Sequence, residues 1–313
     1  MKLISIVTPC YNEEENVELV YSKVKEVFDA LPNYTYEHIF IDNASHDKTV
    51  QILKGIAQRD KKVKIIINSR NFGHIRSPHH ALLQSRGDAV VLLFSDLQDP
   101  PALIADFIKK WEEGYKVVMG VKIQSDESSV FFAVRKLYYR LINKLSDIPL
   151  TDNFTGFGLY DKKVIEVLRE INDVYPYFRG LISDIGFDSI KISYHQAVRK
   201  RGITKNNFYT LYDLAMLGIT NHSKIPLRLA AMIGFLLSLL SLLAAFIFFI
   251  AKLLFWDKFT LGMAPLVIGL FFFSSVQLFF LGIIGEYIGS IHTQVLKRPL
   301  VIEKERINFD LNV

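Results

Sequence analysis

The sequence predicts an α/β domain with a largely parallel sheet, followed by two membrane-spanning helices. In the first part of the 313-residue chain, short apolar strand-like runs alternate with amphipathic helical ones. This alternation is typical of a sheet covered by helices on both faces. Near the other end, residues 229–251 and 259–285 are long uncharged runs, and each is long enough to cross about 30 Å of hydrocarbon as a helix. Only seven residues separate the two runs, so we expect a tight helical hairpin.

The predicted elements of the first domain follow from the spacing of their apolar residues. Residues 13–31 carry Val17, Val20, Val24 and Phe28 on one helical face, and Pro32 ends the helix. Short β-branched runs bounded by polar residues indicate strands. The expected strands are 3–8, 38–41, 63–67, 89–94 and 117–121, and the further helices are 47–59, one that ends near 85, and 101–113.

Polar clusters follow the first, second and fourth predicted strands. They are Tyr11-Asn12-Glu13, Asp42-Asn43-Ala44-Ser45 and Ser95-Asp96-Leu97-Gln98-Asp99. In sheets of this kind, ligands bind at the carboxyl ends of the strands, where the strand order reverses. We therefore expect the ligand site at this edge.

Two of these clusters allow a ligand-binding and a purely structural interpretation. The Asp42 carboxylate is placed to accept hydrogen bonds from a base or ribose, but an Asx turn or helix cap explains it equally well. Asp96, Gln98 and Asp99 bring several oxygen ligands to one strand end, as a hard divalent cation requires. Asp99 alone is also explained as the cap of a helix that begins with proline.

Six short motifs, taken in order, resemble family-2 glycosyltransferases of the GT-A fold. The resemblance is to the polyprenyl-phosphate branch, which includes bactoprenol glucosyltransferases and dolichyl-phosphate mannose synthase, and it spans nearly the whole chain. The motifs are Pro9-Cys10-Tyr11-Asn12-Glu13, Asp42-Asn43-Ala44-Ser45, Arg70-Asn71-Phe72-Gly73, Asp96-Leu97-Gln98-Asp99-Pro100, Pro226-Leu227-Arg228 and Gly285-Glu286-Tyr287-Ile288-Gly289.

The resemblance implies a Rossmann-like GT-A domain over residues 1–206 and an inverting sugar transfer. The donor is a nucleotide sugar, with UDP favoured, and the acceptor is polyprenyl (undecaprenyl) phosphate. It implies Mg²⁺ or Mn²⁺ held by Asp96 and Gln98, with Asp96 and Asp99 as catalytic residues. The implied nucleotide-sugar-binding residues are Pro9, Tyr11, Glu13, Asp42, Arg70, Asp96 and Gln98.

The chain departs from the family pattern at two positions. The metal motif usually reads Asp-x-Asp, and Phe94 stands at its first acidic position. Gly156 stands where relatives carry an aspartate proposed as the base. A phosphate monoester carries roughly −1.5 to −2 charges at pH 7 and is already a nucleophile. The missing base therefore favours a phosphate acceptor over a sugar hydroxyl.

Two basic clusters are candidates for binding the acceptor phosphate. Arg135 lies on an amphipathic basic segment suited to the membrane surface, and a solvated helix face is the alternative. Arg199 and Lys205 match basic positions of the family pattern. Residues 207–224 are expected to form an interfacial amphipathic helix, with a core helix as the alternative.

Charge distribution predicts the orientation in a membrane. Basic residues flank the hairpin of residues 225–290 on both outer sides, and the segment 291–313 is interpreted as a basic cytosolic tail. The positive-inside rule then places both termini and the catalytic domain in the cytoplasm. No signal peptide is expected at the N-terminus, so the prediction is a multi-pass protein of a bacterial inner membrane. The net charge of +5 favours anionic lipid over nucleic acid as a partner.

Alternative functions and partners follow from the same residues. Phe94 and Gly156 keep open a non-catalytic nucleotide-sugar-binding assembly protein. A processive polysaccharide synthase is disfavoured, since neither tryptophan completes a Gln-x-x-Arg-Trp motif. His74, His79 and His80 lack further ligands at zinc-site spacing, so helix-surface or substrate-loop roles are expected for them. The resemblance is also compatible with a homo-oligomer such as a tetramer.

Overall fold

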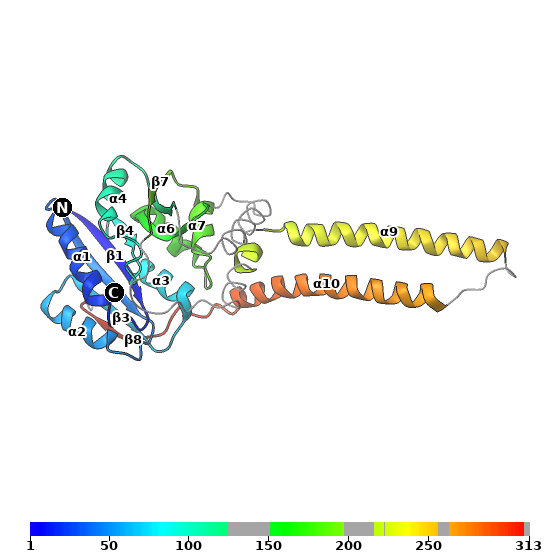
Figure 1. Ribbon diagram of the computed structural model, residues 1–313, viewed down its shortest axis with the longest axis horizontal. Coiled ribbons are helices and arrows are strands. Elements are labelled where there is room, and N and C mark those ends of the chain that lie inside the picture. Colours follow the sequence, from blue (N-terminus) through cyan, green and yellow to red (C-terminus); the bar gives the residue numbers. More distant parts are fainter. Residues whose placement is uncertain (124–150, 197–215, 222, 256–262, 310–313) are drawn as a thin grey trace.

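The computed structural model describes residues 1–123, 151–196, 216–221, 223–255 and 263–309. It contains an eight-stranded sheet with helices on both faces and a long helical hairpin (Figure 1). The first elements are β1 (Lys2–Cys10), α1 (Val17–Asp29), β2 (Tyr34–Asp42), α2 (Thr49–Arg59), β3 (Val63–Asn68), α3 (Gly73–Leu83), β4 (Ala89–Leu92), α4 (Leu103–Glu112) and β5 (Val117–Lys122). The later ones are β6 (Phe154–Asp161), α6 (Lys162–Ile171), α7 (Phe178–Ile185), β7 (Ser189–Tyr194), α9 (Ile225–Leu254), α10 (Met263–Val295) and β8 (Glu303–Ile307).

The parallel half of the sheet agrees with the sequence prediction. Strands β4, β1, β2 and β3 lie side by side and run in the same direction. Cys10, the last residue of β1, pairs with Asp42, the last residue of β2. The loops that follow these strands therefore leave the sheet at the same edge.

The strands directly next to this parallel unit, β6 and β8, run in the opposite direction. β6 lies between β4 and β5 and is antiparallel to both, and β7 pairs in parallel with β5. β8 is antiparallel to β3, with Asn68 opposite Glu303 and Ile65 opposite Ile307. The interpretation of residues 291–313 as a tail is corrected here, because α10 continues to Val295 and β8 belongs to the sheet. The charged residues of β8 suit an exposed edge strand.

Two apolar layers hold the helices on the sheet. On one face, Ile6 and Phe40 pack with Val24, Leu53 and Phe107 of the covering helices, and all five side chains are fully buried. The other face carries α3, α6 and α7. Full burial of one such side chain contributes about 1.5–3 kcal/mol. Because helices cover both faces, the central residues of these strands are buried on both sides, and β4 is apolar along its whole length.

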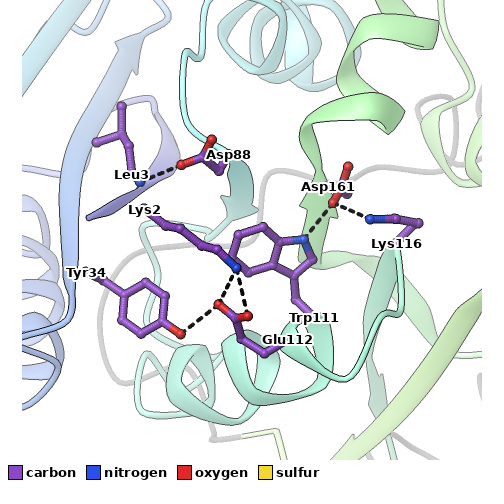
Figure 2. A network of polar contacts seen from close by, with 8 residues as sticks. All are labelled: Lys2, Leu3, Tyr34, Asp88, Trp111, Glu112, Lys116 and Asp161. Carbon is purple, nitrogen blue, oxygen red and sulfur yellow. Dashed lines mark hydrogen bonds and ion pairs between the residues drawn. The ribbon is translucent and has the colours of Figure 1, made fainter.

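A polar network ties the elements together at the edge where β1 and β2 begin (Figure 2). Glu112 accepts hydrogen bonds from Lys2 (2.8 Å) and from the Tyr34 hydroxyl (2.9 Å). Asp161 accepts from Trp111 Nε1 (2.7 Å) and Lys116 (3.0 Å). Burial raises the pKa of Asp161, but the Trp111, Lys163 and Lys116 donors outweigh it and the pKa is lowered. These contacts join β1, β2, α4 and β6 at the edge that lies opposite the loops at the carboxyl ends.

The two predicted membrane segments form helices that lie side by side and point away from the sheet domain (Figure 1). Ile225–Leu254 and Leu266–Val295 have mean hydropathies of 2.7 and 2.3 and are long enough to span a membrane. Near the domain, Tyr287 donates to the Ser223 carbonyl (2.7 Å). Gln294 Nε2 donates to Asp173 Oδ1 in the α6–α7 loop (2.7 Å). The second helix is therefore hydrogen-bonded to the sheet domain.

Candidate functional site

The loops after β1 and β2 are held together by hydrogen bonds. The Asn12 N–H donates to Ser45 Oγ (2.9 Å), and the Glu13 N–H donates to Thr49 Oγ1 (2.8 Å). Asn12 has a φ of +54°, a conformation that Asn tolerates better than most residues. These contacts fix the backbone beside Tyr11 and Glu13, two of the predicted nucleotide-sugar contacts. Pro9 precedes them within β1.

Asp42 occupies the turn that follows β2. It is 0% exposed, and its carboxylate accepts hydrogen bonds from the Ser45 N–H (2.9 Å) and the Ser45 hydroxyl. Burial raises the pKa of Asp42, while the Ser45 donors act in the opposite direction. This is the geometry of the Asx turn described above as the structural alternative. Contact between Asp42 and a nucleotide remains a prediction.

The loop after β3 is fixed by Asn43. Its Nδ2 donates to Asn71 Oδ1 (2.8 Å), and its Oδ1 accepts from the Phe72 N–H (2.8 Å). The Arg70 guanidinium lies over the Phe72 ring, 4.0 Å from the centroid. Arg70 is exposed at this edge, where its charge is available to an anionic ligand.

Residues 96–98, which follow β4, form a constrained turn. Leu97 has a φ of +55°, which is unfavourable for a residue with a branched side chain. The Gln98 N–H donates to Asp96 Oδ1 (3.2 Å). Asp96 and Gln98 are both half-buried, so they border a space that a ligand can enter.

Asp99 is held by β7 and does not cap α4. It is 3% exposed and accepts a hydrogen bond from the Tyr194 hydroxyl. Helix α4 begins at Leu103 without a side-chain cap, so the capping alternative for Asp99 is wrong. Burial raises the pKa of Asp99, while Tyr194 and the Lys122 charge act in the opposite direction.

A cavity of about 370 Å³ brings Asp96, Gln98 and Asp99 together. Its other polar walls come from β5, β6, α3 and α7, and its apolar walls include Phe94 and Phe178. Pro9, Tyr11, Glu13, Asp42 and Arg70 do not line it; they lie along the same edge, after β1, β2 and β3. The lining residues are His74, Ile75, Pro78, His79, Leu82, Leu92, Phe94, Asp96, Gln98, Asp99, Lys122, Thr155, Pro176, Tyr177, Phe178, Arg179 and Gln196.

The side chains at the end of β4 fit a hard divalent cation that takes most of its ligands from the substrate and from water. Asp96 and Asp99 supply carboxylate oxygens and Gln98 an amide oxygen on one cavity wall, which suits Mg²⁺ or Mn²⁺. No group of three His, Cys, Asp or Glu side chains poised for a metal occurs within the described ranges. Such an ion therefore depends on ligands from the nucleotide phosphates.

Of the two departures from the family pattern, Phe94 lines this cavity and Gly156 lies behind two residues that line it, Leu92 and Phe178. Phe94 forms part of its apolar wall. Gly156 has a φ of +106°, and a Cβ added there would lie 3.4 Å from Leu92 Cδ2 and 3.5 Å from Phe178 Cδ1. A side chain at position 156 would thus be strained and directed at the cavity's apolar wall.

Several lining residues were not singled out by sequence reasoning. Lys122 ends β5, and Tyr177 and Arg179 lie at the start of α7. The sequence pattern identifies residues that directly follow strands, whereas Lys122, Tyr177 and Arg179 reach the cavity through the packing of β6 and α7. Arg135, Arg199 and Lys205, predicted to bind the acceptor phosphate, lie outside the described residues.

The short helix before α9 packs on the cavity wall. Residues 216–221 are helical, and Leu217, which is 8% exposed, packs against Tyr177. This end of the predicted interfacial helix 207–224 therefore contacts the domain, as the core-helix alternative expected. Residues 207–215 lie outside the described ranges.

A larger hollow of about 570 Å³ lies at the opposite edge of the sheet. Its lining includes Arg86, Lys162, Arg169 and Arg306 and contains no carboxylate. It has no access to the loops at the carboxyl ends of the strands. Chemistry, and not size, therefore identifies the smaller cavity as the candidate site.

The fold and this site define a GT-A-like nucleotide-sugar domain joined to two helices of membrane-spanning length. The model of glycosyl transferase family 2 matches residues 5–169. YkcC of Bacillus subtilis, an uncharacterized glycosyltransferase, is 38% identical over 300 residues, which cover 95% of this chain and 92% of that protein. A bactoprenol glucosyl transferase of Shigella phage SfII is 34% identical over 305 residues, covering 96% and 97% of the two chains.

The chain therefore belongs to glycosyl transferase family 2. Among solved structures, it is similar to glucosyl-3-phosphoglycerate synthase from Mycobacterium tuberculosis in complex with Mn²⁺, uridine diphosphate and phosphoglyceric acid. The TM-score is 0.46 at 19% identity, over 70% of this chain and 76% of that one.

Proposed function

We propose that this glycosyltransferase transfers a sugar from a nucleotide sugar, preferably a UDP-sugar, to the phosphate of a polyprenyl lipid such as undecaprenyl phosphate. The observation that carries the proposal is the cavity at the carboxyl edge, where Asp96, Gln98 and Asp99 meet. The similarity over nearly the whole chain to bactoprenol glucosyl transferases supports the lipid acceptor. The two long apolar helices support a position of the domain beside a membrane.

The nucleotide part of the donor is assigned to the loops after β1, β2 and β3. Tyr11, Glu13 and Arg70 lie there on a backbone fixed by side-chain hydrogen bonds. The diphosphate then lies toward Asp96 and Gln98, and the sugar enters the cavity. Bound Mg²⁺ or Mn²⁺ at these two residues supplies positive charge that stabilises the departing diphosphate.

The reaction proposed is a direct displacement with inversion. An oxygen of the lipid phosphate forms a bond to the anomeric carbon, while the bond from that carbon to the nucleoside diphosphate breaks. The acceptor is already anionic at neutral pH, so orientation and charge compensation suffice. This accounts for Gly156 at the position of the family's aspartate. Arg135, Arg199 and Lys205 are proposed to bind the acceptor phosphate.

The membrane placement is part of the proposal. The active edge and the N-terminus are assigned to the cytoplasmic side of a bacterial inner membrane, with α9 and α10 spanning it. The side of the sheet domain from which α10 departs is also the side of the carboxyl edge: β8, which follows α10, begins opposite the last residue of β3. A lipid phosphate at the headgroup level is then near the cavity.

The test is to incubate the full-length protein in detergent with undecaprenyl phosphate, Mg²⁺ or Mn²⁺, and a panel of UDP- and GDP-sugars. We expect a new lipid-phosphate-sugar, identified by mass spectrometry, with one donor strongly preferred. The anomeric configuration of the product, determined by NMR, tests inversion. Nucleotide-sugar binding without product from any donor would instead support the non-catalytic binding protein that Phe94 and Gly156 keep open.

A further inference from the structure

His79 is a buried polar residue without a partner on the wall of the candidate cavity. It lies in α3, is 1% exposed, and lines the 370 Å³ space. Neither Nδ1 nor Nε2 has a hydrogen-bond partner in the part of the chain that the structure describes. Among the described residues its ring contacts Phe178, edge-on at 6.2 Å between centroids. Buried polar groups nearly always have partners, so the cavity's occupant is the expected source.

The position of His79 relative to the metal-binding residues indicates which part of the donor it meets. Five residues of α3 line the cavity at helical spacing: His74, Ile75, Pro78, His79 and Leu82. The loop with Asp96 and Gln98 forms another wall of the same space. A donor whose diphosphate reaches that loop therefore places its sugar between the loop and α3.

The chemistry of a neutral imidazole favours a hydroxyl group as its partner. Burial lowers the pKa of His79 to about 4, the charge of Asp173 acting in the opposite direction, so the ring is neutral at pH 7. A neutral imidazole has one donor and one acceptor. A hydroxyl offers both functions, whereas a phosphate oxygen only accepts. The neighbouring Phe94 and Phe178 suit the C–H face of a sugar ring.

We propose that His79 hydrogen-bonds a hydroxyl group of the transferred sugar and is a determinant of donor specificity. The proposal rests on the proposed function, since it takes the cavity as the sugar subsite. It assigns to this chain a donor whose sugar carries a free hydroxyl on the side that faces α3. Because His79 contacts substrate directly, its removal affects sugar discrimination and not nucleotide affinity.

The experiment compares wild type with His79→Phe, which retains a planar ring and removes both hydrogen-bonding atoms. Each is assayed with the preferred UDP-sugar and with analogues that lack one hydroxyl at a time. Wild type is expected to lose about tenfold in kcat/KM with one particular deoxy analogue. His79→Phe is expected to lose about tenfold with the parent sugar and to use that analogue as well as the parent. His79→Asn, which keeps a donor and an acceptor, is expected to recover part of the discrimination.

His80→Gln is the matched control. His80 is the next residue on α3, does not line the cavity, and contacts Glu303 of β8 at 2.6 Å. Its replacement is expected to leave the pattern across the deoxy analogues unchanged. An equal loss by His79→Phe with every donor, or no loss, would overturn the proposal.

A binding measurement tests the role of His79 separately from the proposed transfer reaction. By calorimetry, His79→Phe is expected to weaken binding of the intact UDP-sugar about tenfold and to leave binding of UDP unchanged. This difference in binding is expected even if wild type forms no product. In that case the proposed transfer reaction is wrong, and the proposed sugar subsite is still supported. Equal affinities of both proteins for the UDP-sugar would reject the role of His79.

Discussion

At Gly156 the backbone conformation itself disfavours any residue with a side chain, including one with a carboxylate. The φ of +106° lies in a region that L-residues rarely adopt, and a Cβ would contact Leu92 and Phe178. The Tyr160 hydroxyl donates to the Gly156 carbonyl (2.6 Å), which helps to hold this conformation. The proposed reaction must therefore proceed without a base at this position, and a phosphate acceptor permits this.

The first prediction concerns replacement of Gly156. Gly156→Ala and Gly156→Asp are both expected to destabilise the protein by about 1–2 kcal/mol or more, because either residue is strained at this φ. The Asp variant is not expected to exceed wild type in transfer. Denaturant midpoints measure the loss of stability, and kcat measures transfer. The Ala variant carries the backbone strain without the carboxylate, so it separates the effect of strain from that of charge. Faster transfer by Gly156→Asp would contradict this account.

The second prediction concerns Asp96, a half-buried residue whose only described hydrogen bond is from the Gln98 N–H. Asp96→Asn is expected to reduce transfer at least about 100-fold, because charge stabilisation in a reacting site is worth that much. Its unfolding midpoint should remain near that of wild type. Asp106→Asn, on the exposed face of α4, serves as the control. Full activity in Asp96→Asn would remove Asp96 from the metal site.

Part of this site was predictable from the sequence because parallel strands impose a simple rule. Residues that follow strands meet at one edge, and the structure does place Asp96, Gln98 and Asp99 at one cavity. Lys122, Arg179 and His79 reach the same cavity from other elements, through tertiary packing that no local pattern encodes. The Asp99 partner, Tyr194, is 95 residues away in the sequence.

Among the elements, β8 differs most from the prediction made from the sequence. Its residues are mostly charged and match neither strand alternation nor helical period, so a tail was predicted. The structure instead pairs it with β3 and ties it to the domain by side chains. His80 contacts Glu303 (2.6 Å), and Lys54 contacts Glu305 (2.6 Å). The same limitation applied to β6 and β7, which lie beyond the regular strand-helix alternation.

The third prediction concerns Glu303 and pH. Burial raises the pKa of Glu303, but the hydrogen bonds from His80 and Arg306 outweigh it and hold the pKa at about 2. A carboxyl with a lowered folded-state pKa stabilises the protein above its unfolded pKa, roughly 4.3. That stabilisation is lost as the pH falls from about 4 to about 2. Glu303→Gln is therefore expected to be less stable than wild type at pH 7, on the order of 1 kcal/mol.

The measurement is the difference in unfolding midpoint between wild type and Glu303→Gln at pH 7, 5, 4 and 3. The difference should be present from pH 7 to 5 and should shrink below about pH 4. Glu305→Gln is the control, since its exposed ion pair with Lys54 contributes little. A difference that does not change with pH would show that the charge of Glu303 is not the stabilising feature.

The whole molecule is organised so that one edge of the sheet faces the attachment of the helical hairpin. α10 leads into β8, which begins opposite the last residue of β3, at the carboxyl edge. The α6–α7 loop connects the two regions: Asp173 accepts from Gln294 of α10, while Pro176 and Tyr177 line the cavity. Under the proposed membrane placement, we expect this connection to fix the height and orientation of the site above the bilayer, and not merely to tether it.

The last prediction tests this coupling. Gln294→Ala removes the hydrogen bond to Asp173 and loosens the cavity-lining loop relative to α10. Transfer to undecaprenyl phosphate in a bilayer should fall several-fold, because the lipid phosphate is confined to the headgroup level and must meet a site at fixed height. Transfer to a short, water-soluble prenyl phosphate, which diffuses freely to the site, should change little.

Both acceptors are to be assayed with the same protein in liposomes, and kcat/KM compared. Thr293→Ala is the matched control: Thr293 precedes Gln294, and among the described residues its hydroxyl donates to the Gly289 carbonyl within α10. An equal fall with both acceptors would mean that Gln294 supports the structure of the loop and not its position above the membrane. No change with either acceptor would show that the hairpin serves as an anchor alone.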